Sequence, residues 1–146
     1  MTLSLNEKIC QIKHSQLLII DIQERLVSAM PVAVIDNVIK NSRVLLQAAN
    51  ELGIPVIHSE QNPKGLGPTV TAITDNLPNT SHRITKTHFS CANAEGFNEL
   101  IAKQTRQQII ITGIESHICV LQSALQLQRQ GYTVYVVEDA ICSRKK

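Results

Sequence analysis

The sequence contains one cysteine whose position favours nucleophilic chemistry. Cys119 follows a β-branched run at 109–111, a break at Gly113 and a restart of helical periodicity after Ser116. This pattern is typical of a buried parallel strand that turns into a helix. Cys119 then falls in the first turn of that helix, where free backbone N–H groups and the helix dipole stabilise a thiolate. Because free cysteines are also among the most buried residues, a packing role stays open.

Two further ionisable residues stand at comparable positions. Asp21 follows the apolar run 17–20, which is typical of a central parallel strand, and Lys86 belongs to a short extended segment at 82–90. In a parallel sheet the carboxyl ends of the strands meet at one edge, where ligands bind. A cysteine nucleophile needs a base and a positive neighbour, which Asp21 and Lys86 would supply. Asp21 is also a reasonable cap for a helix starting near Glu24, and this alternative stays open.

The elements that position these residues alternate along the chain. We expect strands over residues 16–23, 55–60, 82–90, 109–111 and 132–139, and helices over 34–52, 94–103 and from 119 to about 130. This alternation predicts an α/β fold, a three-layer α/β/α sandwich on a mainly parallel, Rossmann-like sheet. Segment 61–79 contains three prolines, so we expect a long loop with one helical turn near 69–74. The first fifteen residues are expected to form an extension or a short helix.

The composition is that of an ordinary globular protein and gives no sign of nucleic-acid or membrane binding. The 146 residues suit one domain, with 43% hydrophobic and 18% charged residues, which are ordinary globular values. A net charge of +2, scattered cations and 3% aromatic residues give no sign of a nucleic-acid surface. The apolar run at 17–20 is too short for a signal peptide or a membrane span, so we expect a cytoplasmic protein with no membrane partner. No Cys-x-x-Cys is present, and we expect free thiols.

Three separated motifs resemble the isochorismatase-like cysteine hydrolase family, which includes nicotinamidases and N-carbamoyl amide hydrolases. They are Leu-Ile-Ile-Asp-Ile-Gln at 18–23, Lys-Thr-His-Phe-Ser at 86–90 and Gly-Ile-Glu-Ser-His-Ile-Cys-Val at 113–120. Segment 59–69 is similar, more narrowly, to the isochorismatase domain-containing branch. The resemblance runs from Leu17 to Ser143. It implies a Cys-Asp-Lys catalytic triad, no cofactor, a small-molecule substrate and a homo-oligomer.

The resemblance assigns roles to particular residues. The triad falls on Asp21, Lys86 and Cys119. A cis peptide bond is implied between Ile114 and Glu115, with the backbone N–H groups of Glu115 and Cys119 forming an oxyanion hole. Further candidates for the wall of the pocket are Gln23, Phe89 and His117. A core position for Phe89, and helix capping or solvent exposure for His117, are equally reasonable.

The chain departs from the family pattern at two places. Nicotinamidases carry an Asp-x-His metal motif after the second strand, where this chain has Ser59-Glu60-Gln61, so we predict no catalytic metal and doubt nicotinamide as substrate. Family members also continue for another helix and strand after the position of Ser143, whereas this sequence ends at Lys146. We therefore expect residues 1–146 to form a single isochorismatase-like domain without that last unit.

The expected function is cysteine-dependent hydrolysis of a small amide or a related C–N substrate through a thioester. Isochorismatases that cleave a vinyl ether lack the nucleophilic cysteine, so Cys119 argues against that reaction. Two alternatives stay open. One is a catalytically idle scaffold or oligomerisation module with the same fold. The other is a redox-sensing protein that uses the same thiol.

Overall fold

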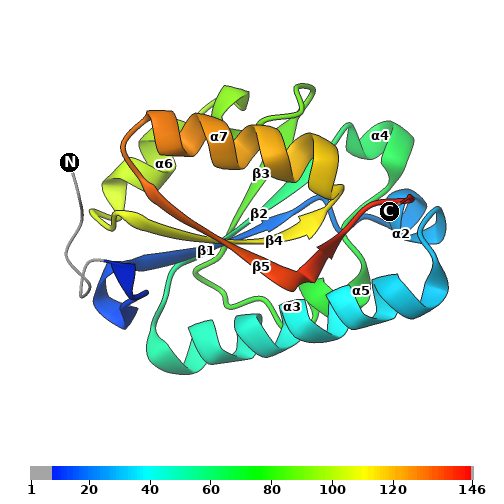
Figure 1. Ribbon diagram of the computed structural model, residues 1–146, viewed down its shortest axis with the longest axis horizontal. Coiled ribbons are helices and arrows are strands. Elements are labelled where there is room, and N and C mark those ends of the chain that lie inside the picture. Colours follow the sequence, from blue (N-terminus) through cyan, green and yellow to red (C-terminus); the bar gives the residue numbers. More distant parts are fainter. Residues whose placement is uncertain (1–7, 146) are drawn as a thin grey trace.

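A parallel sheet of five strands, in the order β3-β2-β1-β4-β5, forms the centre of the molecule. The computed structural model describes residues 8–145. The strands are β1 Ser15–Ile20, β2 Val56–Gln61, β3 His82–Lys86, β4 Gln108–Ile114 and β5 Thr133–Cys142. Helices α3 and α5 lie on one face and α6 and α7 on the other (Figure 1). The predicted three-layer α/β/α fold is therefore confirmed.

The helices differ greatly in length. Their bounds are α2 Glu24–Ser28, α3 Val32–Leu52, α4 Pro63–Leu66, α5 Thr71–Thr74, α6 Phe97–Lys103 and α7 Leu121–Arg129. Three short turns complete the set: η1 Ile12–His14, η2 Cys91–Asn93 and the π-helical η3 Ser116–Val120. Among residues 8–145 we find no helix that is both long enough and apolar enough to cross a bilayer.

Buried side chains, most of them hydrophobic, attach helices to both faces of the sheet. All six residues of β1 are buried, as expected for a central strand covered on both faces. Helix α3 places a stripe of buried residues against one face: Ile35, Val38, Ser42, Leu46 and Ala49. On the other face Phe97 and Ile101 of α6 and Leu127 of α7 are buried. Gly53 ends α3 in a left-handed conformation, with φ of 69°.

The strand order reverses between β1 and β4. The chain runs outward from β1 through β2 to β3, then crosses back to β4 and continues outward to β5. Such a reversal leaves a crevice beyond the carboxyl ends of the two central strands, which is where α/β proteins bind ligands. The fold thus points to the segments that follow β1 and β4.

Two local predictions differ from the structure. Segment 61–79 contains two short helices, α4 and α5, in place of one turn, because Pro63 starts an additional helical turn. Strand β5 continues to Cys142, so Glu138 and Asp139 lie within it and not at its end. A register irregularity against β4 accompanies this extension. Of the expected N-terminal extension, residues 1–7 lie outside the described residues, and η1 precedes β1.

Candidate active site

Asp21 is the first residue after β1, and its carboxylate is completely buried. Its backbone has a φ of 51°, a left-handed conformation that aspartate tolerates better than most residues. Ser59 Oγ donates a hydrogen bond of 2.7 Å to Oδ1, and Lys86 Nζ donates one of 2.7 Å to Oδ2. Both oxygens are therefore held by residues of β2 and β3, which fixes the carboxylate at the carboxyl ends of the strands.

Lys86 ends β3, and its ammonium group is also buried. Besides Asp21, Nζ lies 2.7 Å from Gln61 Oε1, 3.2 Å from the His88 carbonyl and 3.5 Å from Cys119 Sγ. Burial lowers the pKa of Lys86, but Asp21, Cys91 and Cys119 together outweigh burial, so this pKa is raised overall. Lys86 is therefore a permanent cation that faces both the carboxylate and the sulfur.

Cys119 lies in η3 and is 6% exposed. Burial raises the pKa of the Cys119 thiol to about 12, and Asp21 adds to this effect while Lys86 opposes it. The thiol is thus protonated in the free protein, whereas the sequence favoured a thiolate at a helix start. The difference arises mainly because the sulfur is buried, and also because the Asp21 carboxylate adds a negative charge beside it; sequence position alone reveals neither.

The turn between β4 and η3 brings the backbone close to β1. Gly113 has a φ of 128°, and a Cβ atom there would lie 2.1 Å from the Ile20 carbonyl oxygen. The Ile114–Glu115 peptide bond is cis. Glu115 is 4% exposed, and among residues 8–145 its backbone N–H forms no hydrogen bond. Buried backbone donors are nearly always paired, and this donor is an exception. It is therefore available to a ligand.

A cavity of about 220 Å³ opens beside the thiol. It is lined by Leu26, Gln61, Leu66, Phe89, Glu115, Ile118, Cys119 and Arg144. A mostly apolar wall with a few polar groups is typical of a small-molecule site. A larger hollow of about 670 Å³ lies nearby, but its lining residues include none of Asp21, Lys86 and Cys119. We therefore place the candidate chemistry in the smaller cavity.

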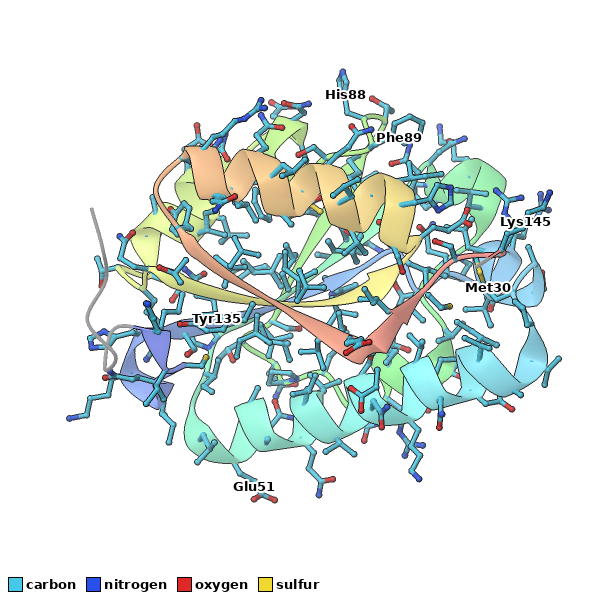
Figure 2. The ribbon with its side chains drawn as sticks, viewed as in Figure 1. Met30, Glu51, His88, Phe89, Tyr135 and Lys145 are labelled. Carbon is cyan, nitrogen blue, oxygen red and sulfur yellow. The ribbon has the colours of Figure 1, made fainter. Side chains whose placement is uncertain are left out.

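The three further pocket candidates have different positions. Phe89 lines the cavity and is 51% exposed; Figure 2 shows it at the same side of the molecule as α4. Gln23 lies outside the cavity wall, because its amide is used to hold the carbonyls of Gln61 and Gly67. His117 lines the larger hollow instead, where its Nδ1 lies 2.6 Å from Ser143 Oγ.

Several residues of the site were not found from the sequence. Ser59 contacts Asp21, and Gln61 contacts Lys86. Both lie at the carboxyl end of β2, and a position at the carboxyl end of a strand was also the signal that indicated Asp21. Arg144 lines the cavity from the segment after β5, and no pattern indicated it. The neighbouring Glu60 is structural, since its carboxylate accepts hydrogen bonds from the N–H and hydroxyl of Thr69.

Within the described part of the chain, histidine, cysteine, aspartate and glutamate side chains form no cluster of three or more that fits a metal ion. All four cysteines are free, and Cys10 is the exposed one. Besides Cys119, the wall of the cavity carries the charged side chains of Glu115 and Arg144, and Lys86 lies 3.5 Å from the sulfur.

Several known proteins are similar to this chain in sequence and in fold. The isochorismatase domain model matches residues 15–146. The isochorismatase domain-containing protein 2 of Xenopus laevis is 37% identical over 135 residues, which cover 92% of this chain and 63% of that protein. A structure of the MAR1 ribonuclease from Caenorhabditis elegans superposes with a TM-score of 0.86 and 38% identity, covering 93% of this chain and 68% of that one.

A more distant structure shares the fold alone. The YcaC gene product of Escherichia coli, described as an octameric hydrolase of unknown specificity, has a TM-score of 0.80 and 24% identity. The match covers 92% of this chain and 66% of that one. This chain thus spans about two thirds or less of the length of these related proteins.

Proposed function

The chain belongs to the isochorismatase family of hydrolases, and from this premise we propose that it hydrolyses a small amide, or a related C–N compound, with Cys119 as nucleophile. The observation that carries the proposal is the meeting of three side chains from three separate segments. Lys86 Nζ lies 2.7 Å from Asp21 and 3.5 Å from Cys119, and Cys119 lines the cavity. The proposed nucleophile and the proposed base therefore both lie beside the same cation.

The first half of the reaction forms a thioester. Asp21 accepts the proton of the Cys119 thiol while the sulfur attacks the carbonyl carbon. Deprotonation accompanies the attack, because a thiol with a pKa of about 12 is not ionised at rest. The proton then passes from Asp21 to the leaving nitrogen, the C–N bond breaks and the amine departs. Lys86 orients Asp21 throughout and supports negative charge near the sulfur.

Two backbone donors would stabilise the tetrahedral intermediate. The buried N–H of Glu115 is not used by any acceptor in residues 8–145, and we assign it to the oxyanion together with the N–H of Cys119. Losing one such donor typically costs about a hundredfold or more in rate. Water then attacks the thioester while Asp21 takes one of its protons. The C–S bond breaks, the proton returns from Asp21 to the Cys119 sulfur, and the carboxylic acid is released.

Size and charge balance favour a small neutral substrate. The cavity holds about 220 Å³, and its aliphatic and aromatic wall is formed by Leu26, Leu66, Phe89 and Ile118. The two ion pairs at the site, Lys86 with Asp21 and Arg144 with Glu115, leave no net charge to attract an ionic group. We also propose a homo-oligomer, in line with the octamer described for the distant YcaC protein.

The test is a panel of small amides, with ammonia release as the readout, together with an RNA oligonucleotide, because one similar structure is named a ribonuclease. We expect turnover of at least one amide, and a loss of about a thousandfold or more in Cys119→Ala. The matched control is Cys10→Ala, which removes an exposed cysteine and should leave the rate unchanged.

Three other outcomes would contradict the proposal. Amide hydrolysis that survives in Cys119→Ala excludes the cysteine mechanism. Cleavage of RNA without hydrolysis of any amide assigns a nuclease activity instead. A stable sulfenic acid on Cys119, without turnover of any amide, assigns redox sensing.

A further inference from the structure

The segment that follows β5 is tied to the turn in front of Cys119. Arg144 donates three hydrogen bonds to the Glu115 carboxylate: from its backbone N–H at 3.1 Å, from Nε at 3.3 Å and from Nη2 at 3.0 Å. Next to it, Ser143 Oγ accepts from the His117 N–H at 3.3 Å and lies 2.6 Å from His117 Nδ1. Residues 143 and 144 therefore hold residues 115 and 117 through both backbone and side chains.

The two members of the Glu115–Arg144 pair differ in burial. The Glu115 side chain is 5% exposed, whereas that of Arg144 is 56% exposed. Burial raises the pKa of Glu115, but the hydrogen bonds and the charge of Arg144 outweigh burial and lower this pKa overall. Glu115 is therefore a buried carboxylate whose charge is balanced from the rim of the cavity.

This placement puts a carboxylate next to a group that is assigned to stabilise negative charge, and Arg144 balances that carboxylate. The N–H of Glu115 is one of the two donors assigned to the oxyanion, and its carboxylate belongs to the same residue. An unpaired carboxylate at this position would repel the negative oxygen that forms during the reaction. This repulsion is strong in a partly buried site, where the effective dielectric constant is lower than in water. Fixed donors aid catalysis only when the surrounding charges do not oppose the developing charge.

We propose that Arg144 is a positioning residue for the oxyanion hole, which acts by fixing Glu115 and neutralising its carboxylate. The inference rests on the proposed cysteine hydrolase function and adds a residue to it. In this role Arg144 binds the Glu115 carboxylate. It acts through Glu115, so its removal should harm steps that form an oxyanion and spare steps that do not.

Two reactions of Cys119 allow a step that forms an oxyanion to be compared with a step that does not. With p-nitrophenyl acetate the sulfur bonds to the carbonyl carbon, an oxyanion forms and collapses, and p-nitrophenolate leaves. With iodoacetamide the sulfur bonds to a methylene carbon, iodide leaves and no oxyanion forms. The thiol proton is lost in both, so the ratio of the two rates isolates the oxyanion hole. Each rate is assigned to Cys119 by peptide mass mapping.

In Arg144→Met we expect acylation by the ester to fall about 10- to 100-fold, at or below the range for a lost oxyanion donor, while alkylation changes less than about twofold. Arg144→Lys, which keeps the charge, should be intermediate. Arg129→Met is the matched control, since Arg129 is an exposed residue at the end of α7. Adding Glu115→Gln to Arg144→Met removes the unpaired charge and should recover part of the acylation rate.

Equal losses in both reactions of Arg144→Met, or no recovery with Glu115→Gln, would overturn this inference and leave the proposed function intact. A purely structural role of Arg144 predicts such equal losses, because a displaced thiol reacts slowly with both reagents. A wild-type protein that is not acylated at Cys119 at all would overturn the proposed function as well.

Discussion

The Cys119 thiol and the Asp21 carboxylate share one buried cation, Lys86. The ammonium group lies 2.7 Å from the carboxylate and 3.5 Å from the sulfur, so its charge is directed mainly to Asp21. This explains why Lys86 lowers the thiol pKa without overcoming the opposite effects of burial and of Asp21. A site that is neutral overall avoids a buried thiolate at rest, and it forms negative charge only when a carbonyl is present.

The resting state predicts a pH dependence for Cys119. Because its pKa is about 12, the thiolate fraction and the rate of alkylation by iodoacetamide should rise about tenfold per pH unit between pH 7 and 9. Lys86→Met should slow this reaction further, since Lys86 is the group that lowers the thiol pKa. The rates are measured by mass mapping of each cysteine. A rate that is already constant from pH 7 upward would indicate a thiolate at rest and contradict the assignment.

Among the elements, the contact between β1 and β4 decides how the site is built. Ile20 of β1 is in register with Gly113 of β4, and each strand then delivers a residue of the site one or two positions later. The backbone of Ile20 occupies the space where a side chain at position 113 would start. Glycine is therefore required there for two reasons, a positive φ and a close approach of two backbones.

Gly113→Ala should consequently destabilise the fold by more than about 4 kcal/mol, because the clash is with backbone that cannot move independently. Gly96→Ala is the matched control: Gly96 also has a positive φ, of 79°, but no atom lies within 4 Å of a Cβ placed there. Its cost should be about 1–2 kcal/mol from backbone conformation alone. Urea unfolding of both variants measures the difference, and equal losses would contradict the packing argument.

The hydrophobic layer between the sheet and helix α3 contains a buried histidine, His58. His58 of β2 is in register with Ile19 of β1, a member of the cluster that includes Ile35 and Val38 of α3. His58 is 6% exposed, and its Nδ1 has no hydrogen-bond partner within the described residues. Burial lowers the pKa of His58, with Glu60 opposing this and Arg83 adding to it. The folded protein therefore keeps this imidazole neutral.

The free energy of unfolding should fall as the pH drops below about 6.5, the ordinary pKa of histidine. In the unfolded chain His58 binds a proton near that pH, whereas in the folded protein it does so only at lower pH, so acid favours unfolding. His58→Gln should show a shallower loss between pH 7 and 5 in urea titrations. The exposed His82→Gln should keep the wild-type slope, and identical slopes for all three proteins would refute the role of His58.

Local patterns determined much of the architecture. The apolar runs at 17–20 and 109–111, and the helical period of 35–49, fix strands and helices because their periods match those elements. Asp21 and Lys86 could be placed at one sheet edge, since parallel strands end together. The extent of β5 and the second short helix in 61–79 could not, because they depend on contacts with neighbouring strands and loops.

The sequence by itself determined the fold class and the family, and it predicted which thiol, carboxylate and ammonium groups could act together. Only the tertiary structure decided the partners of these groups and the burial of the Cys119 thiol. Ser59, Gln61 and Arg144 join the site from distant segments, and the raised pKa of Cys119 follows from burial beside Asp21. The physical reason is that strand and helix periods are local properties, whereas desolvation and charge balance depend on every residue that the fold brings near.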